Sequence, residues 1–170
     1  HDSSCYQIVV RLKENSRGDS RFLRQQVKVG KRLTISTPNN LFALIPSARK
    51  HLFIAGGIGI TPFLSHMAEL QHSDVDWQLH YCSRNPESCA FRDELVQHPQ
   101  AEKVHLHHSS TGTRLELARL LADIEPGTHV YTCGPEALNE AVRSAAARLG
   151  IAADTLHFEQ FAGADFRLAW

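Results

Sequence analysis

The sequence lacks an excess of charge of either sign. Its 170 residues include 18 Lys and Arg and 18 Asp and Glu, so the formal net charge is zero. A chain without net charge has no strong field with which to attract nucleic acid or an anionic membrane surface. We therefore expect neither nucleic acid nor a membrane among its partners.

Long apolar runs are also missing. The longest, residues 52–60, contains three glycines and is much shorter than the roughly 20 apolar residues that a membrane-spanning helix needs. The sequence opens at His1 with neither a methionine nor a signal peptide, which predicts that it begins inside a longer chain. These features predict a soluble, cytoplasmic protein.

Cysteine is scarce and scattered. The sequence has four widely separated cysteines, Cys5, Cys82, Cys89 and Cys133. They form no C-x-x-C pair and no ferredoxin-like C-x4-C-x2-C spacing, so neither zinc nor an iron-sulfur cluster is indicated within the chain. His105 and His107 share one face of a predicted strand, but no third ligand is evident. Surface histidines are the simpler interpretation, and we assign no metal.

The pattern after residue 46 predicts an α/β fold. Short β-rich runs alternate there with helical patterns, which is typical of βαβ units and a parallel sheet. The predicted strands are residues 52–55, 77–82, 103–107, 129–132 and 156–161, and the predicted helices are residues 61–70, 89–96, 115–121 and 136–149. Together they predict a doubly wound, five-stranded parallel sheet.

Residues 1–46 have a different pattern, that of antiparallel β structure. Apolar and polar residues alternate over residues 6–12, and further β structure is expected at 22–27 and 33–37. We therefore divide the chain into residues 1–46, a sheet domain at 47–162 and a tail at 163–170.

A glycine-rich bend follows the first predicted parallel strand, where the sequence GGIGITP occupies residues 56–62. Residues without side chains let the backbone turn sharply and approach a ligand, and the start of the following helix favours an anion such as a pyrophosphate. The spacing differs from the G-x-G-x-x-G of common dinucleotide folds. A tight connection with close helix packing is the alternative explanation.

The second predicted strand ends at Ser83 and Arg84, without the acidic residue that often holds an NAD ribose. A guanidinium suits bidentate contact with phosphate, so these residues by themselves favour NADPH. A solvated loop charge is the alternative for Arg84.

A second bend, CGPE, follows the fourth predicted strand. Because open parallel sheets bind ligands along their carboxyl edge, we expect Cys133 to lie close to the bend at 56–62. A thiol there could pack against a nicotinamide ring without blocking it. A small residue buried at a strand end is the alternative.

Four motifs occur in the order and approximate spacing of the ferredoxin-reductase superfamily: GGIGITP at 56–62, YCSR at 81–84, YTCGPEAL at 131–138 and HFEQF at 157–161. The chain most closely resembles the phthalate dioxygenase reductase group, which includes vanillate demethylase reductases. The resemblance implies that residues 47–162 are an NAD(P)H-binding domain and that 1–46 are the end of an antiparallel flavin-binding β-barrel. Residues 163–170 would lead toward a two-iron ferredoxin domain outside this chain.

The resemblance also implies two sets of site residues. Those expected to bind cofactor are Arg17, Gly18, Asp19 and Ser20 at the flavin phosphate and Gly56, Gly57, Gly59, Ile60, Thr61, Pro62, Ser83, Arg84, Cys133, Gly134, Pro135 and Glu136 at the dinucleotide. Asp19 departs from the family, which usually has glycine there. Those expected nearest the reacting rings are Cys133, Glu159 and Phe161, although HFEQF could simply be a final strand.

The function implied by the resemblance is electron transfer. Hydride would pass from NADH or NADPH to FMN, or to FAD, and electrons would continue to a ferredoxin domain or an oxygenase component. Members of the group generally use FMN and NADH, so we favour NADH. One alternative is a regulatory module that binds a dinucleotide without reducing a flavin. The other is a structural or docking domain whose glycine bends serve only connectivity.

Overall fold

A computed structural model describes residues 5–12 and 18–160. The chain divides into two units, residues 1–41 and 42–170. The boundary lies five residues before the predicted one at 46. Each unit is described by itself.

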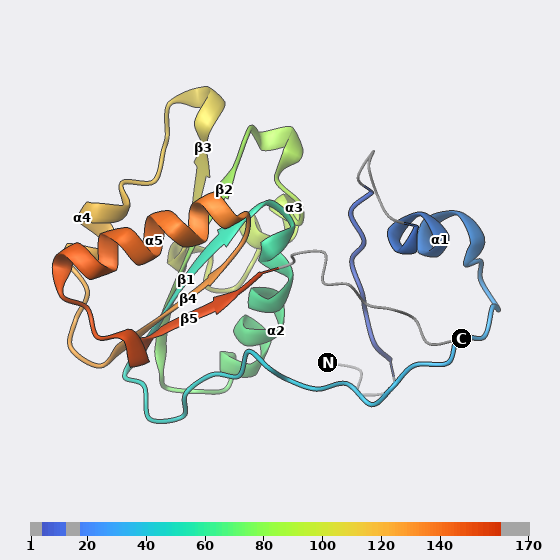
Figure 1. The fold of residues 1–170 in the computed structure, drawn as a ribbon, viewed down its shortest axis with the longest axis horizontal. Coiled ribbons are helices and arrows are strands. Elements are labelled where there is room, and N and C mark those ends of the chain that lie inside the picture. The colour runs from blue at the N-terminus through green and yellow to red at the C-terminus, as the bar shows by residue number, and fades with distance from the viewer. Residues whose placement is uncertain (1–4, 13–17, 161–170) are drawn as a thin grey trace. The chain divides into compact units, whose positions relative to one another are not determined.

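The second unit is built on a five-stranded sheet with the order β3-β2-β1-β4-β5 (Figure 1). Its strands are β1 (Lys50–Gly56), β2 (Asp76–Ser83), β3 (Val104–His108), β4 (Thr128–Cys133) and β5 (Leu156–Glu159). All neighbouring strands are parallel. The predicted doubly wound sheet is therefore confirmed, with β1 at its centre.

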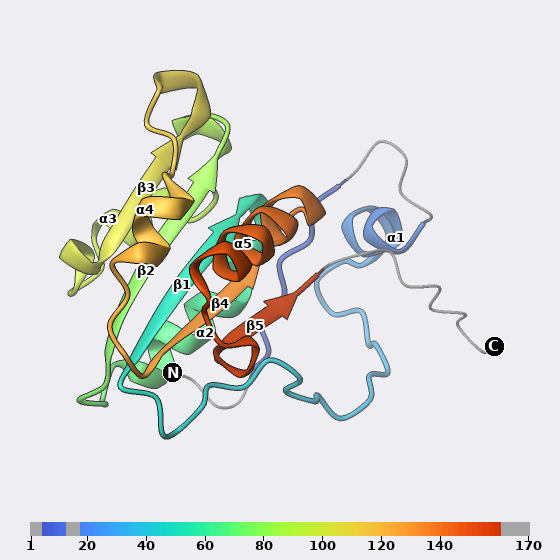
Figure 2. The same cartoon turned by 60° about the vertical axis from the view of Figure 1, so that its left-hand side comes forward.

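Helices cover both faces of this sheet. They are α2 (Thr61–Leu70), α3 (Arg92–Val96), α4 (Leu117–Ala122) and α5 (Glu136–Leu149). Figure 2 shows α4 and α5 on one face and α2 on the other. The helix α5 ends at Gly150, whose φ of 68° gives the left-handed cap that glycine adopts without strain. No helix among residues 5–12 and 18–160 is both long enough and apolar enough to cross a membrane.

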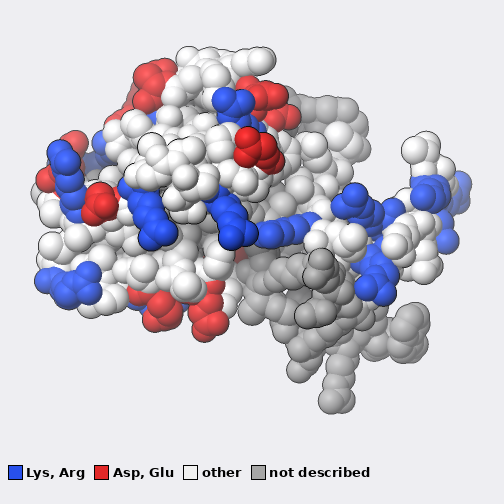
Figure 3. Space-filling model, turned by 90° about the horizontal axis from the view of Figure 1, so that it is seen from above, with Lys and Arg blue, Asp and Glu red and all other residues white. Residues whose placement is uncertain are grey.

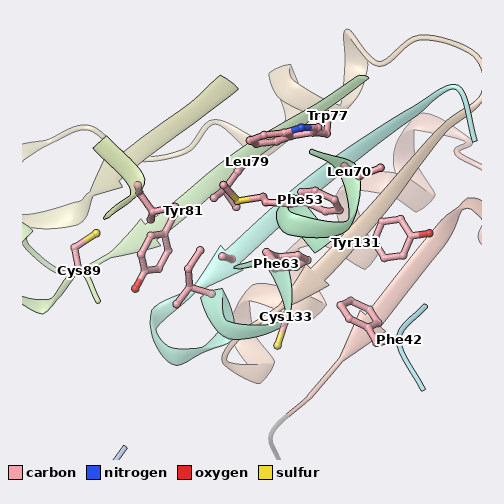
Figure 4. Close-up of a cluster of buried hydrophobic side chains, with 14 residues drawn as sticks. Phe42, Phe53, Phe63, Leu70, Trp77, Leu79, Tyr81, Cys89, Tyr131 and Cys133 are labelled. Carbon is pink, nitrogen blue, oxygen red and sulfur yellow. The ribbon is translucent and has the colours of Figure 1, made fainter. Parts of the chain in front are cut away.

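Side chains along each strand point alternately to the two faces of the sheet, so the core consists of two clusters. Phe53, Tyr81 and Tyr131 point to the face covered by α2, where they form one cluster with Phe63 (Figure 4). On the opposite face Leu52, Ile54 and Val130 pack against Val142 of α5 and its neighbours. Since burying one large apolar side chain contributes about 1.5 to 3 kcal/mol, these layers hold the carboxyl ends of the strands in fixed positions.

The first unit differs from its prediction. Its regular element is the helix α1 (Asp19–Gln26), so the β structure expected at 22–27 is wrong. Residues 6–12 and 33–37 are not in strands either. The physical reason is that a segment becomes a strand only when a neighbour supplies ladder hydrogen bonds, and no described residue of this unit does so. The barrel assignment stays a prediction.

Candidate functional site

The two glycine bends lie side by side at the carboxyl edge of the sheet. β1 and β4 are adjacent strands, with Ala55 paired to Cys133. A Cβ atom added to Gly59 would collide with the Cys133 carbonyl group and lie 2.8 Å from the Gly134 nitrogen. The bends therefore touch backbone to backbone, at the same edge, as expected.

Three glycines serve this contact. A Cβ on Gly56 would lie 2.8 Å from both Leu138 and Pro135, and one on Gly134 would lie 3.0 Å from the Gly56 Cα. The alternative explanation, a tight connection with close packing, accounts for Gly56, Gly59 and Gly134. Gly57, whose φ of 55° lies in the left-handed region, makes the sharp turn between β1 and the helical segment that both explanations require.

The first bend is the start of a continuous helical segment. The 3-10 turn η1 (Gly57–Ile60) runs directly into α2, which has Pro62 in its first turn. The first N–H groups of a helical segment have no partner within it. No side chain caps η1, and its first turn has no acidic residue. This geometry is suited to an anion, and a pyrophosphate fits it.

Two side-chain contacts stabilise the bend. The Thr61 hydroxyl donates to the Ile58 carbonyl at 3.1 Å. The Tyr81 hydroxyl donates to the Gly57 carbonyl at 2.9 Å and accepts from the Ala90 N–H at 3.1 Å. Tyr81 is not among the predicted site residues, although it is the first residue of the YCSR motif.

The ends of β2 and β3 form a second part of the site. Ser83 and His108 are paired in register. The Ser83 Oγ lies 2.7 Å from the His108 Nδ1 and donates to the Asn85 carbonyl at 3.1 Å. Arg84 is exposed, and no ion pair or hydrogen bond joins its guanidinium to the rest of the described chain. His108 is not among the predicted site residues, because its partner is 25 residues away along the chain.

Basic and acidic groups both occur around the domain. In the view of Figure 3, Lys and Arg side chains are interspersed with Asp and Glu side chains and with uncharged surface. Neither sign of charge covers the whole of this face.

Cys133 and Glu159 lie opposite each other at the ends of β4 and β5. The Cys133 Sγ is 3.9 Å from the Glu159 Oε2. Burial, and secondarily Glu159, raise the pKa of the Cys133 thiol to about 12, so it stays protonated at neutral pH. Burial also raises the pKa of the Glu159 carboxyl. Cys133 is completely buried, which fits the alternative of a small core residue, and its contact with nicotinamide stays a prediction.

The remaining predicted site residues are distributed as follows. Pro135 is the N-cap of α5 and Glu136 its first residue, and Ile60, within the first bend, is fully buried. Gly18, with a φ of 128°, precedes α1, and Asp19 and Ser20 form the first turn of that helix. Arg17 and Phe161 lie outside the described residues.

The histidines on β3 are only partly exposed. His105 and His107 are half-buried beside the buried His80 of β2. The His80 Nδ1 lies 3.0 Å from the His107 Nε2, and the rings of His80 and His105 stack at 4.7 Å. Strand pairing brings the three rings together. Even so, no group of three or more potential metal ligands is found among the described residues.

Residues 34–156 match the family described as dimethylamine monooxygenase subunit DmmA-like, N-terminal domain. A carnitine monooxygenase reductase subunit of Escherichia coli (strain K12) is 94% identical over 162 residues, which cover 95% of this chain and 50% of that protein. A phthalate 4,5-dioxygenase oxygenase reductase subunit of Pseudomonas putida is 40% identical over 159 residues, which cover 92% of this chain and 48% of that protein.

A solved structure supports the same relationship. A phthalate dioxygenase reductase, described as a modular structure for electron transfer from pyridine nucleotides to 2Fe-2S, is 33% identical with a TM-score of 0.82, over 90% of this chain and 48% of that one. The chain thus spans about half the length of these relatives. The resemblance to the phthalate dioxygenase reductase group of the ferredoxin-reductase superfamily is confirmed. Because the family match covers most of its length, the chain belongs to the family of DmmA-like N-terminal domains.

Proposed function

We propose that this chain is the NAD(P)H-binding part of a flavin-dependent reductase that supplies electrons to an oxygenase. The observation that carries the proposal is the pair of glycine bends in backbone contact at the carboxyl edge between β1 and β4. One of these bends starts a helical segment that no side chain caps. The names of the relatives, reductase subunits of oxygenase systems, support the same function.

The residues of this chain have distinct roles in the proposal. The N–H groups of the turn Gly57–Ile60 hold the pyrophosphate, and Ser83 and Arg84 hold the adenosine ribose. Cys133 and Glu159 border the nicotinamide, with the thiol remaining protonated and uncharged. Arg17, Gly18, Asp19 and Ser20 hold the flavin phosphate, and Phe161 covers the flavin ring. When bound, the two cofactors supply hydride transfer from nicotinamide to flavin, followed by delivery of single electrons.

We favour NADH and FMN, with a ferredoxin domain or an oxygenase component as the electron acceptor. The Ser83 hydroxyl is already engaged with His108 and Asn85. Arg84 is then the one predicted group at this position that is free to bind an extra phosphate. A single guanidinium also serves a pyrophosphate, so it does not require NADPH.

The test is isothermal titration of the 170-residue chain with NADH, NADPH and ADP-ribose, with adenosine as the control ligand. We expect micromolar affinity for NADH and ADP-ribose and much weaker affinity for adenosine, which lacks the pyrophosphate. If none of the three dinucleotide-type ligands bound, the structural or docking domain would replace the reductase.

A regulatory module that binds a dinucleotide without reducing a flavin is the second candidate. Asp19 favours it, because an acidic residue in place of the glycine that the family usually has there would repel a flavin phosphate. An absorbance spectrum of the chain mixed with FMN separates the two. Bleaching of the flavin by NADH supports the reductase, and binding of NADH without bleaching supports the module.

A further inference from the structure

Tyr81 combines complete burial with a functional position. It lies on β2, is 0% exposed, and is paired in register with Ala55, the residue before Gly56. Figure 4 shows its hydroxyl pointing out of the apolar cluster, away from Trp77 and Leu79. A buried phenol oxygen needs hydrogen-bond partners, and here its partners belong to the candidate site.

The hydroxyl is bound on both sides. It donates to the Gly57 carbonyl at 2.9 Å and accepts from the Ala90 N–H at 3.1 Å. Gly57 opens the turn that we assign to the pyrophosphate. Ala90 ends the segment that follows Ser83 and Arg84, which Asn85 and Ser88 order by a reciprocal cap. A single oxygen atom therefore connects the two parts of the dinucleotide site.

The hydrogen bond to the Gly57 carbonyl also affects the direction in which the Ile58 N–H points. The Gly57 carbonyl and the Ile58 N–H belong to one planar, trans peptide group, so they point in opposite directions. With the carbonyl turned toward the Tyr81 hydroxyl, the Ile58 N–H points away from that hydroxyl. Because Gly57 has no side chain to limit its rotation, the hydrogen bond to Tyr81 helps to fix the orientation of this peptide group within η1.

We propose that Tyr81 is a positioning residue, whose hydroxyl orients the Gly57 peptide toward the pyrophosphate and keeps the Ser83–Arg84 segment in place for the ribose. This inference rests on the proposed function. It adds a residue that touches neither cofactor but determines how tightly the dinucleotide is held.

The chain offers a matched control in Tyr131. It is also 0% exposed and belongs to the same cluster, on the neighbouring strand β4. Its hydroxyl accepts from the Ile45 N–H at 2.8 Å, and Ile45 belongs to neither bend. Removing either hydroxyl leaves a backbone N–H without its partner, and Tyr81→Phe also removes the donor to the Gly57 carbonyl. Both variants should therefore lower the melting temperature, Tyr81→Phe by somewhat more.

The two variants should differ in binding. For the full chain with Tyr81→Phe, we expect the Kd for ADP-ribose and for NADH to rise about tenfold, the effect of one hydrogen bond. With Tyr131→Phe, the Kd should stay within about twofold of the parent value. Equal affinities of Tyr81→Phe and parent, or an equal loss in Tyr131→Phe, would overturn the positioning role. A parent chain that bound neither ligand would instead refute the proposed function.

A second measurement does not depend on how well a variant folds. In the unsubstituted chain, ADP-ribose should slow amide hydrogen exchange at Ala90 together with Ile58 and Gly59, because the Tyr81 hydroxyl connects them. Exchange at Ile45 should not change. Slower exchange in the bend with no change at Ala90 would show that the hydroxyl does not couple the two segments.

Discussion

The centre and the flank of the carboxyl edge are built by different means. At the centre, between β1 and β4, the bends pack backbone against backbone, and a Cβ atom on Gly59 has no room. At the flank, between β2 and β3, the contacts are made by side chains, such as the bond of 2.7 Å between Ser83 and His108. The centre is closed and the flank is exposed at Arg84.

This difference matches what each part would bind. NADH and NADPH both contain a pyrophosphate, so a site made of backbone groups can bind it without distinguishing between the two cofactors. The two cofactors differ at the ribose, where a side chain can be exchanged without moving the backbone. We therefore expect substitutions at the centre to affect folding and binding together, and those at the flank to change binding alone.

The largest effect is expected for Gly59→Val. Its side chain must push the Cys133 carbonyl away and separate the bends, so dinucleotide binding should be lost and the free energy of unfolding should fall by about 3 kcal/mol. Urea unfolding and calorimetric titration measure both. Gly112→Ala is the control for backbone strain without a clash, because a Cβ there meets nothing within 4 Å although φ is 78°. It should cost about 1 to 2 kcal/mol of stability and leave dinucleotide binding unchanged. If the Gly59→Val chain had the stability and affinity of the parent, the two bends could not be packed backbone against backbone at residue 59.

Acid should have the next largest effect. Burial is the main cause that lowers the pKa of His51 and His66 to about 4 and of His80 to about 3, from an ordinary 6.5. As the pH falls from 6.5 toward 4, the unfolded chain binds protons that the folded chain excludes. The free energy of unfolding should therefore decrease, by about 2 to 5 kcal/mol between pH 7.5 and 5.

The same titration separates two groups of buried histidines. The rings of His51 and His66 pack on Tyr131 of β4, whereas His80 stacks on His105 of β3. In urea unfolding, His80→Gln should remove only the part of the pH dependence that belongs to His80. A stability that is constant from pH 7.5 to 5 would contradict the neutral, buried state of all three histidines.

A smaller effect is expected for Arg84→Ala. Because we assign its guanidinium to the ribose itself, which both cofactors contain, and not to the 2′-phosphate of NADPH, the Kd for NADH and for NADPH should rise equally, by about fivefold. Thermal stability should not change, since the side chain is exposed. A larger loss for NADPH would assign Arg84 to the 2′-phosphate and would favour NADPH as the cofactor.

The smallest effect is expected at the opposite, amino edge of the sheet. Asp76 is half exposed and lies 2.9 Å from the Lys103 Nζ and 3.2 Å from the Lys50 Nζ. Ion pairs of this kind contribute little, so Asp76→Asn should lower the free energy of unfolding by about 0.5 to 1 kcal/mol. Its affinity for ADP-ribose should equal that of the parent. A loss of affinity would show that the site extends beyond the carboxyl edge.

Much of the second unit could be predicted because its signals are local. Each predicted strand overlaps an observed one, since apolar runs interrupted by glycine and helical patterns are readable within a few residues. The bends were found for the same reason. The first unit failed because residues 22–27 have no pairing partner among its described residues, and Arg, Leu and Gln are good helix formers.

The order of strands and bends, and with it the edge where a ligand would bind, followed from the amino-acid sequence, because hydrophobic periodicity and glycine act over short stretches of chain. Only the tertiary structure decided that Gly59 touches Cys133, that Tyr81 binds Gly57 and that His80 meets His107. These partners are 24 or more residues apart. Their contacts depend on strand register and side-chain direction, which arise when the whole sheet packs.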